Sequence, residues 1–461
     1  MVIQLLATWI PALLIALSGV LKLSGNPKIV EGMAALGVGR YVRLLGVMEL
    51  VFAALFVFPA TMKLRLYSHV LLLRWRHRDR AVARRPEGQS LPSDRAALDR
   101  RLCPRSIDLF LRTPLMQVGI DSFAAAFDEN SRAVNPAERL RQLVQQIEHA
   151  DEVGLDAFGV GEHHRREFLD SAPAVILGAA AARTQRIRLT SAVTVLSAED
   201  PVRAFQNFAT LDLLSRGRAE MIVGRGSSIE AFPLFGFRLE DYDALFAEKL
   251  DLLLNIRAHE HVHWSGRYRP TLTGQGVYPR PMQNPLPIWL GVGGTPQSFV
   301  RAGQLGLPLM VAIIGGEPRR FRPLIDLYRE TGKQHGYSAE QLSVGVHMLG
   351  YVADTTQEAA DTFFPGYAKA MTDIGKERGW PAMTRASFDA QRGRDGALLI
   401  GSPDEVVDKT LRHAEALGGV SRISFQMNAA SLPQVKMMRA IDAIGARVLP
   451  ALHQGETDTG K

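Results

Sequence analysis

Short apolar runs alternate with amphipathic helical segments from residue 114 to residue 450, and this alternation constrains the fold more than any other feature. Segment 136–154, for example, is typical of a helix with one apolar face. Eight runs are strand-like: 117–123, 156–161, 187–196, 218–226, 287–294, 307–314, 343–353 and 422–428. Alternating strands and helices favour an α/β fold with a parallel sheet. Eight repeats over this length predict a (β/α)8 barrel of the TIM type with insertions. An open doubly wound sheet is the alternative, because periodicity does not show whether a sheet closes.

A glutamate and two histidines directly follow the second strand-like run. The sequence there reads Val160-Gly161-Glu162-His163-His164. Barrel enzymes carry their chemistry at the C-terminal ends of the strands, which is where these side chains are expected. A histidine in such a place can accept or donate a proton near neutral pH. The plainer alternative is that one histidine packs and the other is solvated.

Several motifs in this region resemble those of the luciferase-like flavin-dependent monooxygenases and oxidoreductases. The resemblance covers about residues 115–450. It rests on GEHH (161–164), SAVTVLSAEDPVRAFQNFATLDLLSRGR (191–218), VGRG (223–226), FPLFG (232–236) and LGVGGTPQSFVRAGQLGLP (290–308). It implies a barrel that binds reduced flavin mononucleotide (FMN), or a deazaflavin in some branches, at the C-terminal ends of its strands. The implied activity is a monooxygenase reaction of reduced FMN and molecular oxygen on a small organic substrate. One alternative is a flavin- or deazaflavin-dependent dehydrogenase or reductase, or a flavin-binding protein of this fold without oxygenase activity. Another is a membrane protein in which the barrel is a regulatory domain.

Two segments carry the residues expected to hold the flavin phosphate. Arg225 follows a strand and lies between Gly224 and Gly226, where the backbone can approach a ligand closely. Its planar guanidinium suits a phosphate, and the resemblance assigns it that contact. The second segment offers backbone N–H groups, a helix N-terminus and two hydroxyls. Its residues are Gly293, Gly294, Thr295 and Ser298. The plainer alternatives are a surface arginine in a turn and an ordinary capped helix.

The resemblance also places residues near the flavin ring. His163 matches a histidine at the flavin's reactive edge, and Glu162 is expected to orient it or to contact the barrel interior. His164 is expected to point the other way, because side chains alternate along an extended strand end. Ala192 and Val193 match a site where luciferases carry a cis peptide bond against the flavin ring.

Other features bear on the reaction. Gly224 stands where luciferase itself has a reactive cysteine, so light emission is not expected. No GxGxxG fingerprint follows the first strand, which argues against a built-in nicotinamide domain. We therefore expect a separate flavin reductase to supply reduced flavin. No metal is expected, because His261 and His263 have no carboxylate or thiol at ligand spacing.

Two late segments are read as additions to the barrel. The loop 259–285 is rich in Gly, Pro and aromatic residues, and we predict that it covers the mouth of the barrel. Residues 385–409 resemble the family's late insertion on the substrate side. This segment is expected to return through Gly401 and Ser402 into a helix that starts at Pro403.

Two long apolar segments precede the barrel. Residues 3–20 and 41–59 are each long enough to cross a membrane as a helix. A signal peptide is disfavoured, because no positive segment precedes Ile3 and no A-x-A site follows. With LSGVLKL (17–23), LGVG (36–39), Gly46, Glu49 and Pro59, residues 1–62 resemble the first half of the DoxX-like family of small four-helix membrane proteins. The resemblance implies two transmembrane helices.

A basic stretch joins the two parts. Residues 63–105 hold twelve Lys and Arg against four Asp and Glu, a charge of +8, so the rest of the +7 chain carries −1. The charge therefore does not indicate nucleic-acid binding by the barrel. The stretch reads as a cytoplasmic juxtamembrane linker, as a nucleic-acid-binding segment, or as a shifted reading frame. We favour the shifted frame. Back-translated with GC-rich codons and moved by one base, RWRHRDRAVARR gives GGAIATELSHG, a sequence typical of DoxX-like proteins.

These features predict four regions. They are a DoxX-like membrane region (1–62), a basic linker for which a shifted reading frame is the favoured origin (63–113), a luciferase-like barrel (114–450) and a polar C-terminal tail (451–461). If the two parts form one protein, the membrane anchors it and the barrel is cytoplasmic; otherwise the barrel is a cytoplasmic enzyme. A homo-oligomer is compatible with the sequence. The lone Cys103 lies in the basic stretch, so cysteine chemistry is not informative about the enzyme.

Overall fold

The computed structural model describes residues 115–458, together with 18, 20–24, 46, 47 and 50. The chain divides into two units, residues 1–105 and 106–461. The predicted membrane segments, most of the residues that carry the DoxX-like resemblance and the basic stretch lie outside the described residues, apart from the few positions named above. Within the described residues, no helix combines the length and apolar character of a membrane-spanning segment.

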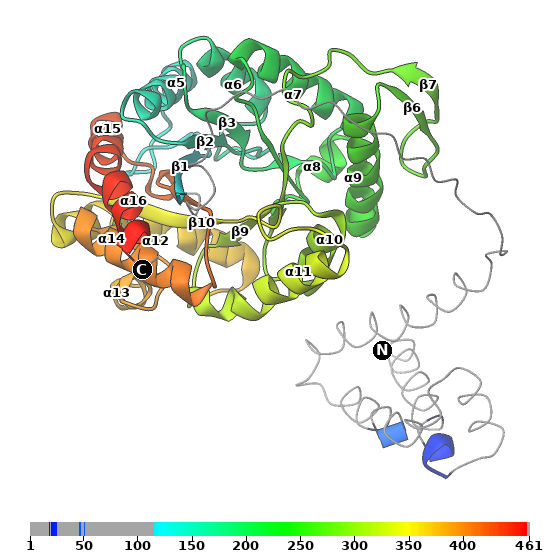
Figure 1. The fold of residues 1–461 in the computed structure, drawn as a ribbon. Coiled ribbons are helices and arrows are strands. Elements are labelled where there is room, and N and C mark those ends of the chain that lie inside the picture. The colour runs from blue at the N-terminus through cyan, green and yellow to red at the C-terminus, as the bar shows by residue number, and fades with distance from the viewer. Residues whose placement is uncertain (1–17, 19, 25–45, 48–49, 51–114, 459–461) are drawn as a thin grey trace, which may run out of the picture. The chain divides into compact units, whose positions relative to one another are not determined.

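Parallel strands form a nearly closed barrel between residues 117 and 426 (Figure 1). Neighbouring strands pair in the order β3-β2-β1-β12-β10-β9-β8-β5-β4. A parallel bridge between Leu189 and Ala219 brings β3 beside β5, and β4 pairs with β5. Because β3 and β4 are two parts of one barrel strand, eight strands surround the interior. The barrel strands are β1 (Gln117–Ser122), β2 (Ala157–Val160), β3 (Arg188–Ser191), β4 (Thr194–Val195), β5 (Met221–Gly224), β8 (Ile288–Val292), β9 (Leu309–Ile313), β10 (Val344–Val352) and β12 (Arg422–Gln426).

All eight strand-like runs thus form barrel strands, and the open doubly wound alternative is excluded. Helices lie between the strands along the chain, and most of them surround the barrel (Figure 1). They are α5 (Pro136–Glu152), α6 (Pro173–Ala181), α7 (Pro201–Ser215), α8 (Ala231–Leu234), α9 (Tyr242–Ala258), α10 (Pro296–Leu305), α11 (Arg322–Gln334), α12 (Thr356–Arg378), α13 (Arg385–Arg392), α14 (Pro403–Ala416), α15 (Gln434–Ala443) and α16 (Leu449–Asp458). Helix α5 shows why such segments are helical: Asn135 accepts a hydrogen bond from the Glu138 N–H, and Pro136 occupies the first turn.

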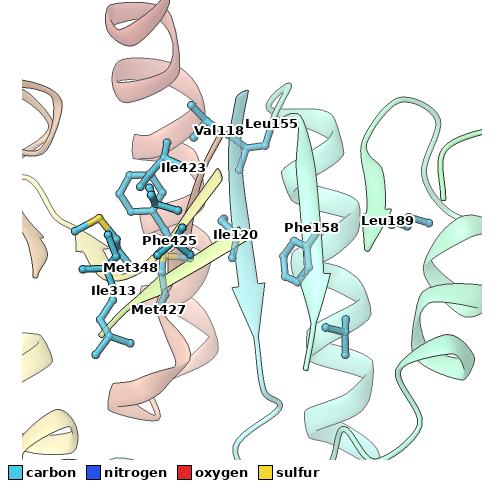
Figure 2. Packing of buried hydrophobic residues seen from close by; sticks show 14 of the residues in the cluster. Val118, Ile120, Leu155, Phe158, Leu189, Ile313, Met348, Ile423, Phe425 and Met427 are labelled. Atoms are coloured by element: carbon cyan, nitrogen blue, oxygen red, sulfur yellow. The ribbon is translucent and has the colours of Figure 1, made fainter. Parts of the chain in front are cut away.

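Side chains alternate across the barrel wall. Figure 2 shows Val118, Ile120, Ile423 and Phe425 in the cluster that packs strands against helices. The residues between them face inward, so a Cβ on Gly119 would lie 3.3 Å from the Ser424 side chain. This period of two separates an apolar outer layer from an interior that holds polar residues.

A buried ion pair fills the N-terminal end of the barrel. Arg422, at the start of β12, lies 2.6 Å from Oε2 of Glu220 and over the Trp289 ring at 4.4 Å. Burial raises the pKa of Glu220, but Arg422 and Arg188 outweigh that effect and hold the pKa below its ordinary value. The charges at the N-terminal end of the barrel are therefore paired with each other. The candidate catalytic side chains lie at the C-terminal end, where barrel enzymes carry their active sites.

The segment 259–285 does not form the predicted cover over the barrel mouth. It contains an antiparallel hairpin, β6 (His261–Trp264) and β7 (Leu272–Gly276), which lies along α9 (Figure 1). Glu248 of α9 holds the hairpin by accepting hydrogen bonds from the N–H groups of Arg267 and Tyr268. Only the tip reaches the rim, where Arg269 lies 2.9 Å from Asp200. Backbone pairing within the hairpin and the carboxylate of α9 explain the difference.

The late insertion and the C-terminus are more ordered than their sequences suggest. Segment 385–409 forms α13, and β11 (Leu399–Gly401) adds to β10 before Ser402 caps α14. Residues 451–458 belong to α16 and not to a free polar tail. Leu452 is fully buried, and His453 Nε2 lies 3.1 Å from the Met116 carbonyl oxygen. Two leucines, Leu449 and Leu452, outweigh the polar composition of this end.

Candidate active site

A small cleft opens at the C-terminal ends of β2, β4 and β5. It is lined by residues from three separate segments: Glu162, His163, His164, Val195, Gly226, Ser227, Ser228 and Ala231. The parallel strands end on the same face, so the loop after β2 meets the loop after β5. The fold therefore brings the predicted catalytic segment beside part of the predicted phosphate-binding segment.

His163 is held by a carboxylate that the sequence analysis did not identify. Its Nδ1 lies 3.0 Å from Oδ2 of Asp170, which is fully buried. Burial raises the pKa of Asp170, and the hydrogen bond with His163 partly offsets this. With the Nδ1 proton facing the carboxylate, Nε2 is left with a lone pair. The pair can therefore accept a proton at the cleft.

Aromatic rings and a glycine fix the position of this imidazole. Phe123 and Phe168 lie 4.6 Å and 4.4 Å from His163, measured between ring centroids. A Cβ on Gly161 would come within 2.5 Å of Phe123 and 2.6 Å of Asp170. Glycine is therefore required at position 161 for the His163–Asp170 pair to approach the strand end.

Glu162 orients His164 and not His163. One of its oxygens lies 3.1 Å from His164 Nε2, and the other accepts a 2.9 Å hydrogen bond from the Val195 N–H. The hydrogen bond to Glu162 raises the pKa of His164, although burial opposes it. Both histidines line the cleft, but His163 packs against Phe123 and His164 against Phe235, so the expectation that they point in different directions stays a prediction.

Charged groups beneath the cleft are partly desolvated. Burial raises the pKa of Glu199, and the charge of the neighbouring Glu162 adds to the rise. Burial lowers the pKa of Lys249 to about 8, and its Nζ donates a 2.8 Å hydrogen bond to the Ser197 carbonyl. Both pKa shifts show that burial disfavours the charged forms of Glu199 and Lys249. This part of the barrel is therefore shielded from water.

Arg225 lies between a carboxylate and the start of α10. Its two terminal nitrogens lie 2.5 Å from Asp243 Oδ1 and 3.4 Å from Thr295 Oγ1. Tyr242 supports it, with the guanidinium 5.2 Å from the ring centroid. Gly226 adopts a φ of 78° and accepts a 2.6 Å hydrogen bond from the Tyr242 hydroxyl. The predicted phosphate-binding arginine and threonine therefore converge.

The start of α10 has the form of an anion site. Thr295 is its N-cap, but the side chain makes no capping hydrogen bond and faces Arg225. Gly293 and Gly294 are exposed, and a Cβ on either would meet no atom within 4 Å. Ser298 is half-buried, and its N–H bonds to the Thr295 carbonyl. Open glycine backbone and a hydroxyl at a helix start beside an arginine suit a phosphate.

The peptide bond between Ala192 and Val193 is cis, as the sequence analysis expected. It lies between β3 and β4 in the barrel wall. A Cβ on Gly224 would lie 2.7 Å from the Val193 side chain, and one on Gly291 would lie 2.8 Å from it. Two neighbouring strands therefore need glycine to accommodate Val193. The contact of Ala192 and Val193 with a flavin ring stays a prediction.

Within the described residues, no group of three or more potential metal ligands comes together. His261 and His263 lie in the hairpin, where His261 Nδ1 lies 3.1 Å from the Gly274 carbonyl oxygen.

The family model described as "Luciferase-like monooxygenase" matches residues 116–420. The chain belongs to this family. Its predicted enzyme class, a flavin-dependent oxidoreductase acting as a monooxygenase, agrees with relatives that are named monooxygenases. The matched region begins at residue 116, so it lends no support to the DoxX-like resemblance of residues 1–62.

Three similar proteins describe the range of the family. The chain is 25% identical to the 4-hydroxyprotoasukamycin monooxygenase of Streptomyces nodosus subsp. asukaensis over 63% of this chain and 81% of that protein. It is 32% identical to an F420-dependent glucose-6-phosphate dehydrogenase of Amycolatopsis mediterranei over 36% of this chain and 51% of that protein. The oxygenating constituent of 3,6-diketocamphane monooxygenase from Pseudomonas putida, solved with FMN, has the same fold. Its TM-score is 0.60, with 18% identity over 73% of this chain and 98% of that chain.

The residues at the barrel mouth fit a flavin or a deazaflavin. The chemistry of the donor set is that of a phosphate site, since an arginine, a hydroxyl and open glycine backbone meet at a helix start. One relative is named an F420-dependent enzyme, and one protein of the same fold was solved with FMN. Arg225, Gly226, Gly293, Gly294, Thr295 and Ser298 would hold the phosphate end, and Ala192 and Val193 would contact the ring.

Proposed function

We propose that the barrel is a monooxygenase that uses reduced FMN and molecular oxygen to oxidise a small organic substrate. The observation that carries this proposal is the common location of two sites. The Arg225–Thr295 anion site and the His163–Asp170 pair both lie at the C-terminal face of one barrel. Bound reduced flavin supplies the electrons that activate oxygen.

The protein's own residues would bind, orient and move protons. Arg225 and the start of α10 would fix the phosphate and so the position of the ring. His163, oriented by Asp170, would accept or return a proton at Nε2. The rings of Phe123 and Phe168 would keep water from that imidazole.

Free reduced flavin would come from a separate flavin reductase. No dinucleotide fingerprint accompanies the first barrel strand, which reads QVGIDS. The experiment is oxygen uptake by the purified protein with FMN, NADH and an unrelated flavin reductase. Substrate-dependent uptake supports the proposal. Tight FMN binding with no oxygen uptake under any reducing condition contradicts it.

A deazaflavin-dependent dehydrogenase is the second candidate. The F420-dependent relative is 32% identical over its matched part, which favours this alternative. Titration with FMN and with F420 separates the two functions, because each cofactor has its own fluorescence. Preference for F420 by tenfold or more would replace FMN in the proposal.

For residues 1–62 and 63–113 we keep the expectations drawn from the sequence. If both parts are one protein, residues 1–62 anchor the barrel to the cytoplasmic side of a membrane. The nucleotide sequence around codons 62–114 distinguishes a true basic linker from a shifted reading frame.

A further inference from the structure

The interior of the barrel holds a second histidine–carboxylate pair. Nδ1 of His347 on β10 lies 2.6 Å from Oδ2 of Asp121 on β1. Both side chains occupy inward positions of their strands, and the residues are only 8% and 2% exposed. Unpaired charges are rarely buried, so a histidine and a carboxylate at this depth depend on each other.

This pair repeats the geometry of His163 and Asp170. In both pairs Nδ1 faces a buried carboxylate, so Nε2 is free to accept a proton. Among residues 115–458, no group forms a hydrogen bond with Nε2 of His347. This atom is also not fully enclosed by the protein, unlike the buried polar atoms that have no partner. Nε2 of His347 therefore keeps access to water.

Phe123 lies between the two histidines. Its ring stacks on His347 with centroids 5.9 Å apart and planes 10° apart, and it contacts His163 at 4.6 Å. His163 lines the cleft. His347 is thus one aromatic ring deeper than His163, on the inner side of the same mouth.

The pair also adjoins the cis peptide. A Cβ on Gly159 would lie 2.1 Å from Asp121 Oδ1 and 3.0 Å from the Ala192 Cβ. Asp121 and Ala192 therefore face each other across Gly159, and any larger residue at 159 would separate them. If Ala192 contacts the flavin ring, the Asp121–His347 pair lies next to that ring.

We propose that His347 is a second proton acceptor of this active site and that Asp121 is its positioning residue. The inference rests on the proposed function. In that reaction, reduced flavin, oxygen and substrate give oxidised flavin, oxygenated substrate and water, so two hydrogens pass from the flavin to water. His347 accepts one proton at Nε2, and its imidazolium is stabilised by the Asp121 carboxylate. The proton then leaves from Nε2 to the developing water, which restores the neutral ring.

The test uses the full chain with His347→Gln, Asp121→Asn and, as a matched control, His413→Gln. His413 is equally buried at 7% exposure but lies on α14, where its Nε2 bonds to the Gly396 carbonyl. We expect the first two variants to slow substrate-dependent oxygen uptake by about 10²–10⁴-fold, the usual weight of acid–base catalysis. FMN affinity should stay within about twofold of wild type, which is the level of a single weak contact. His413→Gln should keep its turnover rate.

A second readout does not depend on turnover. Nitrogen-15 NMR of histidine-labelled, flavin-free protein should show the Nδ1–H tautomer for the signal that His347→Gln removes. In Asp121→Asn the amide would donate to Nδ1, so the signal should change to the Nε2–H tautomer. Normal turnover in His347→Gln, or equal losses of rate and FMN affinity, would overturn the proposal. An unchanged tautomer in Asp121→Asn would also overturn it. If the wild-type protein binds no flavin, the proposed function is wrong. The tautomer change in Asp121→Asn would then still show whether Asp121 positions His347.

Discussion

Arg225 and Thr295 lie within 3.4 Å of each other although 70 residues separate them in the sequence. One follows β5 and the other begins α10, and only the parallel order of β5 and β8 brings these ends together. The cofactor proposal depends on this contact, because neither residue alone distinguishes a phosphate site from a turn or a helix cap.

His163→Ala should slow turnover by about 10²–10⁴-fold while flavin affinity stays nearly intact. The reason is that His163 and Asp170 form the proton-accepting pair at the cleft. Substrate-dependent oxygen uptake with a supplied reductase measures the rate, and fluorescence titration measures the affinity. A normal rate with a lowered melting temperature would mean that His163 only packs against Phe123 and Phe168.

Gly294→Ala should weaken FMN binding without destabilising the fold. A Cβ at this position meets no atom of the chain within 4 Å, so it would occupy the space expected for the phosphate. We expect a loss of about tenfold, or roughly 1.4 kcal/mol. Gly178→Ala is the control, since its Cβ also meets nothing and it lies within α6. Unchanged FMN affinity in Gly294→Ala would place the phosphate elsewhere.

The stabilisation from His164 should be lost as pH rises. Its hydrogen bond with Glu162 raises its pKa above 6.5, the ordinary value. The contribution is therefore complete below pH 6.5 and disappears as pH passes the raised pKa of the folded state. Urea unfolding of wild type and His164→Gln should differ by on the order of 1 kcal/mol at pH 5.5 and converge at alkaline pH. A constant difference would show that His164 stays neutral.

The barrel should fold without the residues that precede it. All of its strands and helices, and its core cluster, lie between residues 115 and 458. A fragment that starts at Pro114 should be soluble and bind flavin as the full chain does. Aggregation of the fragment, with a folded full chain in detergent, would mean that the two units depend on each other.

The barrel could be predicted because each strand is a separate apolar run bounded by turn residues. The loops after these strands carry the residues predicted to bind the cofactor, and two of these residues, Arg225 and Thr295, are in contact. The carboxylates beside His163 and His347 were not identified from the sequence. Asp170 lies in a loop whose course follows no period, and Asp121 and His347 meet only because β1 and β10 both flank β12.

Sequence composition gave a wrong prediction where contacts to the backbone determine the structure. The mouth cover predicted for 259–285 became a hairpin because Glu248 binds its backbone. A polar side chain at an inward strand position is the signal that would have identified Asp121 and His347.

The most direct test of the cofactor site compares FMN with riboflavin, which lacks the phosphate. Arg225→Ala should weaken FMN binding by about 1.5–3 kcal/mol, the range for a hydrogen bond to a charged group. Riboflavin binding should hardly change. Fluorescence titrations of both ligands against wild type and variant give the four affinities. A selective loss for FMN is the predicted result, and equal losses for both ligands would contradict the assignment of Arg225 to the phosphate.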